Sequence, residues 1–326
     1  MDVTNAVATR GRLAARPGFG RALEGSLRER LVQPLILFSG CEEERRAIAA
    51  LPGQYYLSIT EAVREARAAA RAGIAGVLLF AAPDRRDESA LIAAQRDWLV
   101  PRAVRAIKDA VPELGVVTDV CVCAYTSHGQ CVLLAEGGAD VRGTQERLAE
   151  IATTHAGAGV DLVVLSGMLP ESVAPVRAAL ATAGHDGAAV AGVVKFVSAL
   201  YAPYRAAVGI PSTSERAVPL PEAGELEVAI ARASADLAAG ADLIVVEPGV
   251  SALDVVGALR ARLSAPIASF HVAGEYVLLR SGVEQGLIDE AALLPEVAKG
   301  ARRAGADLVF SYAALETAEF LEDEAA

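Results

Sequence analysis

A lysine inside an apolar run is the residue of this sequence best placed to do chemistry. Lys195 lies within residues 188–201, which are almost entirely apolar, and lysine occurs elsewhere only as Lys108 and Lys299. A buried ammonium is costly unless it is paired, and a lysine in such surroundings can lose its proton and attack a carbonyl substrate. Lys195 is therefore a candidate for imine formation. A strand-end lysine that reaches solvent or pairs with a carboxylate fits the same segment.

Three cysteines form a second chemical motif. Cys121, Cys123 and Cys131 have the spacing Cys-x-Cys-x7-Cys. Three thiolates suit zinc and leave one position open for water or substrate, whereas a closed structural zinc site takes four ligands. His128 lies in the same segment and is either a fourth ligand or a group outside the ligand set. The spacing predicts a zinc site, with reduced structural cysteines as the alternative.

Composition restricts the class of protein. The 326 residues are 53% hydrophobic and 22% charged, and the net charge is −11. An acidic chain whose arginines are interspersed with carboxylates has no basic face for nucleic acid. The apolar runs fall short of the ~20 residues that a bilayer requires, and the first residues do not resemble a signal peptide. We expect a cytoplasmic protein whose partners are small molecules, with no nucleic acid and no membrane among them.

Short apolar runs alternate with longer segments of helical period. The runs are 35–40, 76–81, 115–121, 161–167, 188–196, 242–249, 266–274 and 307–313. The helical segments are 60–72, 101–111, 144–158, 170–183, 225–239, 251–263 and 295–304. Eight such units predict an α/β fold, a (β/α)8 TIM barrel. A doubly wound open sheet is the alternative, but no Gly-x-Gly-x-x-Gly follows the first run to support it.

Three further features concern the organisation of the chain. Residues 1–33 are too short and too polar for a domain, so we expect an N-terminal arm for oligomerisation, followed by a catalytic barrel over 34–326.

The recurring phrase Ala-Gly-x-Asp, which ends at Asp161, Asp242 and Asp307, predicts the end of a helix and the start of a strand. Residues 206–224 are rich in proline, serine and glycine and predict a long loop that serves as a lid.

In a barrel of this kind the chemistry lies where the strands end. That rule brings the following residues to one mouth: Asp119, Cys121, Cys123, Ser166, Lys195, Glu247, His271, Glu275 and Tyr312.

Three segments resemble one enzyme family. Residues 119–131, Asp-Val-Cys-Val-Cys-Ala-Tyr-Thr-Ser-His-Gly-Gln-Cys, are similar to the three-cysteine zinc segment of the porphobilinogen synthases, also called 5-aminolevulinate dehydratases. Residues 195–205 resemble the catalytic lysine segment of that family, and 270–276 resemble its Val-Ser-Gly-Glu-Tyr segment. The resemblance covers roughly 34–318. It implies a (β/α)8 barrel that condenses two 5-aminolevulinate molecules into porphobilinogen, commonly as an octamer held by N-terminal arms.

The resemblance also shows where this chain departs from the family. Two lysines of the family form imines, and they correspond to Lys195 and, within Val-Glu-Pro-Gly at 246–249, to Glu247. Ala273 stands in place of a serine that, with the tyrosine matching Tyr312, binds the carboxylate of the first substrate. Gly167 replaces an aspartate. The half of the site that serves the second substrate retains its lysine, its arginines and its cysteines.

Each candidate residue receives an expected role. The catalytic candidates are Lys195, Glu247, Asp119 and Tyr201; the substrate-binding candidates are Arg205, Arg216, Tyr312 and Ser166; the zinc ligands are Cys121, Cys123 and Cys131. Glu136 marks a region where some relatives bind an allosteric Mg²⁺.

We expect a diverged, zinc-dependent hydro-lyase that condenses or dehydrates an amino-keto acid, 5-aminolevulinate or an analogue, near Lys195, with the first-substrate half rebuilt around Glu247. Glu247 either quenches Lys195, acts as a general base, or binds a cationic substrate group. An ordinary porphobilinogen synthase of tetrapyrrole biosynthesis and a catalytically silent binding paralogue are the alternatives. The expected assembly is a homo-oligomer, from a dimer to an octamer.

Overall fold

Eight parallel strands close into a barrel in the computed structural model, which describes residues 11–41, 43–167, 169–211, 216–222 and 224–321. In barrel order they are β1 (Leu31–Phe38), β4 (Gly76–Ala82), β5 (Gly115–Asp119), β8 (Leu162–Val164), β9 (Ala189–Lys195), β10 (Leu243–Glu247), β11 (Ile267–His271) and β12 (Leu308–Ser311). The barrel closes where β12 pairs with β1. The predicted TIM barrel is confirmed, and each predicted run overlaps one barrel strand. β1 begins at Leu31, so the boundary expected between residues 33 and 34 falls inside this strand.

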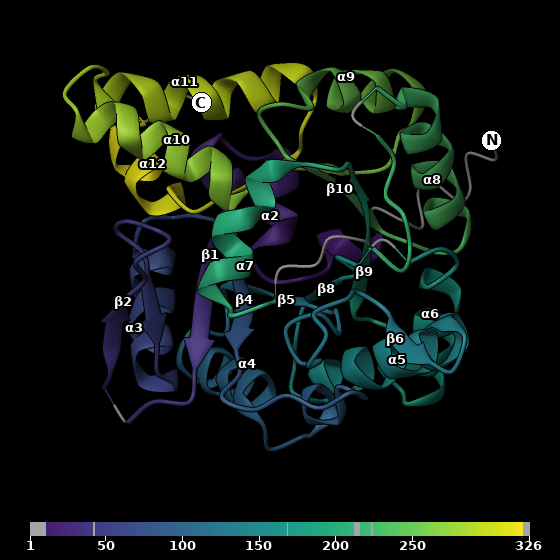
Figure 1. Cartoon of the computed structure of the whole chain (residues 1–326). Coiled ribbons are helices and arrows are strands. Elements are labelled where there is room, and N and C mark those ends of the chain that lie inside the picture. Colours follow the sequence, from purple (N-terminus) through teal and green to yellow (C-terminus); the bar gives the residue numbers. More distant parts are fainter. Residues whose placement is uncertain (1–10, 42, 168, 212–215, 223, 322–326) are drawn as a thin grey trace.

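Helices form a ring outside the strands (Figure 1). Those that match the predicted segments are α3 (Ile59–Arg71), α4 (Leu99–Ala110), α5 (Val141–Gly157), α6 (Val173–Thr182), α8 (Leu226–Ala238), α9 (Leu253–Arg262) and α11 (Glu290–Ala304). The sequence reasoning missed α2 (Phe19–Glu24), α7 (Ala202–Ala207), α10 (Ala273–Glu284) and α12 (Ala314–Phe320). The buried residues of α10 are confined to its first turn, so it carries no apolar stripe of helical period. Within the described ranges, no helix is long and apolar enough to cross a membrane.

Several short strands and 3₁₀ turns lie outside the eight barrel strands and their helices. They are the hairpin strands β2 (Arg45–Ala47) with β3 (Tyr55–Leu57), and β6 (Leu133–Ala135) with β7 (Gly138–Asp140), and the 3₁₀ turns η1 (Arg28–Arg30), η2 (Leu91–Ala94) and η3 (Ala199–Tyr201). In Figure 1, α7 crosses in front of the barrel strands; it lies mostly before the segment predicted as a lid, 206–224, and overlaps it only at its last two residues.

The three aspartates of the Ala-Gly-x-Asp phrases tie neighbouring strands together at the bottom of the barrel. Each accepts, at 2.9 Å, the backbone N–H of a residue at the start of the preceding strand: Asp161 from β5, Asp242 from β9 and Asp307 from β11. Each carboxylate also pairs with a cation, respectively Lys108, Arg177 and Arg260. A buried carboxylate is stable only when it is paired in this way. The repeated phrase therefore sets the register of alternate strand pairs.

The described part of the N-terminal segment closes the bottom of its own barrel. Phe19 is fully buried, and a Cβ added to Gly115 at the start of β5 would come within 2.8 Å of its ring. Gly18 has a φ of 77°, and the carbonyl of Ala75 leaves no room for a side chain there. Arg12 Nε donates to Asp242 at 2.8 Å. Residues 1–10 lie outside the described residues, so packing of an arm on another subunit stays a prediction.

Replacing Asp242 by asparagine is expected to destabilise the barrel. Its carboxylate is fully buried and forms ion pairs with both Arg12 and Arg177, so Asp242→Asn leaves two guanidinium groups without their anion. Breaking a buried pair in this way costs about 3–5 kcal/mol. The urea midpoint of unfolding should fall accordingly. Asp254→Asn, an exposed position in the first turn of α9, is the matched control; equal losses for the two variants would contradict the assignment.

Candidate active site

Lys195 and Glu247 end neighbouring strands and face each other. They are opposite one another in the β9–β10 register, and Lys195 Nζ lies 3.5 Å from Glu247 Oε1. Both residues are less than a tenth exposed. Burial alone would lower the pKa of Lys195, but the Glu247 carboxylate and the nearby cysteine sulfurs outweigh burial and hold that pKa above its usual value. Burial raises the pKa of Glu247, and Lys195 partly offsets that effect. The lysine is therefore held as a cation when the site holds no ligand.

Tyr201 covers this pair. It lies at the end of η3, a turn that begins where the Ser198 hydroxyl accepts the N–H of Leu200. The Tyr201 hydroxyl donates to the backbone carbonyl of Glu247 at 3.1 Å, and Lys195 Nζ lies 5.5 Å from the centre of its ring. An ammonium at that distance from an aromatic face is attracted to it. Tyr201 thus contacts both partners, through a hydrogen bond to the backbone of Glu247 and through its ring to Lys195.

Asp119 and Ser166 form a second polar pair beside the lysine. Asp119 ends β5, Ser166 follows β8, and the serine hydroxyl donates a short hydrogen bond to the aspartate. Burial raises the pKa of Asp119 to about 7, although the hydrogen bond from Ser166 and the charge of Lys195 act in the opposite direction. A carboxyl group with a pKa near neutrality can both accept and donate a proton.

The three cysteines converge on one point. Their sulfur atoms all lie within 4.8 Å of one another, and the sulfurs of Cys121 and Cys123 are 3.3 Å apart. Hydrogen bonds from those two thiols lower the pKa of Cys131. Thiolates bind zinc at about 2.3 Å, so this close group of soft ligands fits zinc. When bound there, zinc would supply a Lewis acid to the cavity.

Other candidate ligands do not join this group. His128 uses Nδ1 to accept the N–H of Gln130 at 3.1 Å, and no histidine accompanies the three sulfurs among the described residues. A zinc ion held by these three sulfurs would therefore have its fourth position open to water or substrate. Glu136 is exposed in the β6–β7 turn, and in the described part of the chain the cysteines are the only cluster of three metal-ligating side chains. The expected magnesium site consequently has no support here.

A cavity at the carboxyl ends of the strands brings most predicted site residues together. Those lining it are Asp119, Cys123, Cys131, Ser166, Lys195, Tyr201, Arg205, Arg216, Glu247 and Tyr312. Arg205 comes from α7 and donates to the carbonyl of Pro211 at 2.5 Å, while Arg216 comes from the segment that follows. The Arg216 guanidinium therefore comes from the segment predicted as a lid, residues 206–224, and the Arg205 guanidinium comes from the residue directly before it. The catalytic and binding roles of these residues stay predictions.

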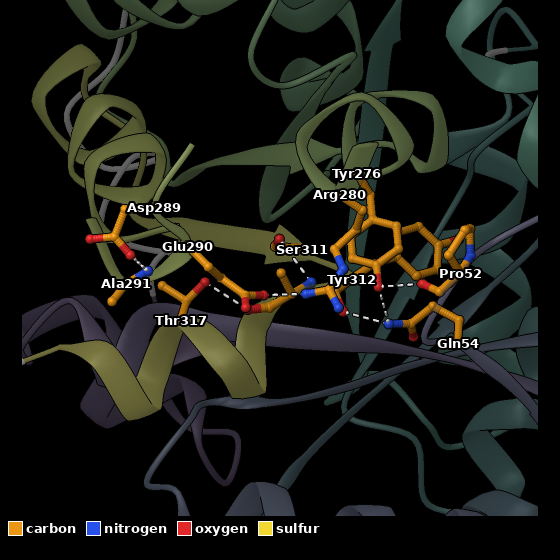
Figure 2. Close-up of polar contacts among 11 residues, drawn as sticks. Pro52, Gln54, Tyr276, Arg280, Asp289, Glu290, Ala291, Ser311, Tyr312 and Thr317 are labelled. Carbon is orange, nitrogen blue, oxygen red and sulfur yellow. Dashed lines mark hydrogen bonds and ion pairs between the residues drawn. The ribbon is translucent and has the colours of Figure 1, made fainter. Parts of the chain in front are cut away.

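Tyr312 is positioned by hydrogen bonds to its backbone carbonyl, and its side chain lines the cavity. Its carbonyl accepts from Gln33 Nε2 and Gln54 Nε2, each at 3.0 Å. Gln54 also donates to the Tyr276 hydroxyl at 3.2 Å, which in turn donates to the carbonyl of Pro52 at 2.7 Å (Figure 2). The Tyr312 hydroxyl itself is buried and has no hydrogen-bond partner. An unpaired buried hydroxyl is costly, so it is suited to a ligand.

Two residues that the strand-end rule brought to the mouth lie elsewhere. Glu275 does not line the cavity; its carboxylate accepts the N–H groups of Gly249, Val250, Ser251 and Val272 at 2.8–3.0 Å. It therefore anchors the loop after β10 to the start of α10. His271 is buried outside the cavity lining, because side chains of a strand alternate between its two faces. Gln33 and Gln54, which hold Tyr312, were missed because no spacing or motif signals them.

Comparison with known proteins gives one consistent result. The family model for delta-aminolevulinic acid dehydratase matches residues 22–320. The delta-aminolevulinic acid dehydratase of Methanothermobacter thermautotrophicus is 38% identical over 268 residues, 82% of each chain. That of Escherichia coli is 37% identical over 278 residues, which are 85% of this chain and 86% of the relative. The crystal structure of the Toxoplasma gondii enzyme (porphobilinogen synthase), in complex with its product porphobilinogen, has a TM-score of 0.86 at 32% identity and covers 90% of this chain and 84% of its own.

The cysteine group is expected to bind one zinc ion per chain. Cys131→Ser removes one of three ligands and should weaken zinc binding by more than about 100-fold, since even the loss of a residue that only orients a ligand costs about 10- to 100-fold. Metal content after dialysis and the thiolate absorption of a cobalt-substituted sample measure this without an activity assay. Cys41→Ser, at an exposed cysteine, is the control; zinc retention by Cys131→Ser at the wild-type level would contradict the assignment.

Proposed function

The chain belongs to the delta-aminolevulinic acid dehydratase family, and from that premise we propose that it is a zinc-dependent hydro-lyase that binds an amino-keto acid, 5-aminolevulinate or an analogue, as an imine on Lys195. The substrate carboxylate lies against Arg205 and Arg216, which line the same cavity as the lysine. The observation that carries the proposal is a buried lysine in the cavity lining, next to the converging cysteines and 3.5 Å from a carboxylate that can take its proton. This arrangement provides one amine for imine formation.

Imine formation requires Lys195 to give up a proton. Glu247 is the nearest base, and transfer of that proton to its carboxylate leaves a neutral amine beside the substrate ketone. The amine adds to the carbonyl carbon, and one water molecule leaves as the C=N bond forms. Glu247 returns the proton that it took to the departing oxygen, so that water leaves and the carboxylate is charged again, while Asp119 and Ser166, on the other side of the lysine, hydrogen-bond the same oxygen.

The partner of this amino-keto acid differs from it. Glu247 occupies the place of the second imine-forming lysine, and Ala273, which lines the cavity, offers no hydroxyl to a carboxylate. Both changes affect the same half of the site. The second substrate is therefore not held by an imine of its own, and its carboxylate would lack the serine that the family uses.

Two other functions remain in competition, each with one observation in its favour. The likeness to the porphobilinogen-bound Toxoplasma gondii enzyme favours an ordinary porphobilinogen synthase. The Lys195–Glu247 ion pair favours a silent binding paralogue, because it holds the lysine as a cation. Assembly into a homo-oligomer of two to eight subunits and a cytoplasmic location are further parts of the proposal.

Trapping with borohydride tests the imine. Zinc-loaded protein incubated with 5-aminolevulinate and borohydride should gain one adduct per chain, and Lys195→Ala should gain none, because the one amine among the described residues that line the cavity is then removed. Intact-protein mass spectrometry counts the adducts. Absence of the adduct in the wild type would contradict imine chemistry and support the silent paralogue.

The double variant Glu247→Lys/Ala273→Ser is the matched control. It restores the second amine and the hydroxyl in the rebuilt half, so it should carry two adducts where the wild type carries one. Two adducts in the wild type, or one in a folded double variant, would show that Glu247 and Ala273 do not set the number of imines.

A further inference from the structure

The wall of the cavity divides into two arcs of different chemistry. From β5 through β8 to β9 it carries Asp119, Ser166 and Lys195, with the cysteines beside them. Arg205 and Arg216 also line the cavity, the first from α7 and the second from the segment that follows it. From β10 through β11 and β12 to β4 it is built mostly of apolar and aromatic side chains, including Phe80, Phe270 and Phe310. Glu247 lies at the boundary between the two arcs, because it ends β10 and faces Lys195 across the β9–β10 pairing.

The second arc offers very few polar groups. Among the described residues of these strands that line the cavity, the polar side-chain groups are the Glu247 carboxylate and the Tyr312 hydroxyl, and Tyr204 of α7, whose ring centroid lies 4.9 Å from that of Phe80, adds a hydroxyl beside them. The aromatic rings are packed together, with centroids of Phe270 6.3 Å from Phe80, 6.0 Å from Phe310 and 6.2 Å from Tyr312. Tyr312 is 1% exposed and its hydroxyl has no hydrogen-bond partner, so it can form a hydrogen bond with a ligand.

We propose that this second arc binds an aliphatic primary amine in its ammonium form, one that carries no carboxylate, as the second substrate. The inference rests on the proposed function and names the class of molecule that meets the amino-keto acid on Lys195. Glu247 accepts the ammonium, Tyr312 accepts or donates a further hydrogen bond, and the aromatic side chains take the alkyl part. Ammonium groups bind favourably between a carboxylate and aromatic faces.

A carboxylate would be rejected by the same arc. It would meet the negative charge of Glu247, and the described lining residues of β10, β11, β12 and β4 include no cation, while Lys195 across the boundary is already paired with Glu247; an unpaired buried carboxylate is strongly unfavourable. The amino end of α10 is the remaining feature that attracts anions, and the Glu275 carboxylate already lies there, accepting the N–H of Val272. An anion arriving at this end would be repelled by a second carboxylate.

Lys195 and the amine share one carboxylate. With Nζ 3.5 Å from Oε1, the lysine ammonium already neutralises Glu247, so an incoming ammonium competes with it. Removal of the lysine charge should therefore strengthen amine binding, whereas removal of the carboxylate should abolish it. A site in which the amine simply filled apolar space would show neither response.

Calorimetric titration with n-butylammonium chloride tests the inference on the zinc-loaded protein. The wild type should bind the probe saturably, and 1-butanol, which has the same chain without the charge, at least about tenfold more weakly. Glu247→Gln should weaken binding of the ammonium at least about tenfold, which is the effect of losing about 1.4 kcal/mol. Glu146→Gln, the same substitution at an exposed site on α5, should leave it unchanged. Equal binding of the two probes, or equal binding by wild type and Glu247→Gln, overturns the inference.

Lys195→Met separates this inference from the proposed function. The variant has no amine for an imine, so its binding of n-butylammonium is independent of imine chemistry, and it should bind the probe about tenfold more tightly than the wild type. Weaker binding by Lys195→Met contradicts competition for Glu247 and overturns the inference. Adduct formation on Lys195 without binding of n-butylammonium rejects the amine site alone, whereas binding without an adduct supports the amine site and rejects the imine.

Discussion

A buried ammonium needs an anion, and in this barrel Glu247 provides it for Lys195. The pair joins two neighbouring strands at their carboxyl ends and lies at the boundary between the cationic, sulfur-rich arc and the aromatic arc of one cavity. With a lysine in place of Glu247 the cavity would hold two amines that depress each other's pKa. With a carboxylate it holds one amine that stays charged until a ligand or a proton transfer changes the balance. The chemistry available to each arc follows from that single side chain.

The remainder of the fold serves to place this pair. Asp161, Asp242 and Asp307 fix alternate strand pairs at the bottom of the barrel, so the register that sets Lys195 opposite Glu247 is defined at both ends. At the carboxyl ends of the strands, the Glu275 carboxylate accepts hydrogen bonds from the N–H groups of the loop after β10 and so fixes the backbone that follows Glu247. Rigid strands and tethered loops are what a site requires when a proton has to move across 3.5 Å.

The sequence was most informative where residue type and spacing carry chemistry. A lone lysine in an apolar run, three clustered cysteines and eight alternating units were enough to predict the barrel and to name ten residues that line the cavity. It was least informative where function depends on backbone contacts. Gln33 and Gln54 hold Tyr312 through its carbonyl, and Glu275 binds only N–H groups, so no pattern of side chains distinguishes them from ordinary polar residues. The sequence did not signal that Phe19 and Gly18 of the N-terminal segment would fit against the starts of the strands of the same chain, because that contact depends on how closely the strand backbone approaches them.

With Glu247 in the first-substrate half of the cavity, the protein is proposed not to condense two molecules of 5-aminolevulinate but to use a different second substrate. Steady-state formation of porphobilinogen from 5-aminolevulinate by the zinc-loaded wild-type protein tests this claim most directly. We expect no product at an enzymatic rate, because one half of the cavity has neither the second amine nor, with Ala273 in its place, the serine hydroxyl that the family uses for the carboxylate. Turnover of about 1 per second with 5-aminolevulinate as the sole substrate, typical of ordinary enzymes, would contradict it and identify an ordinary porphobilinogen synthase that works with one lysine.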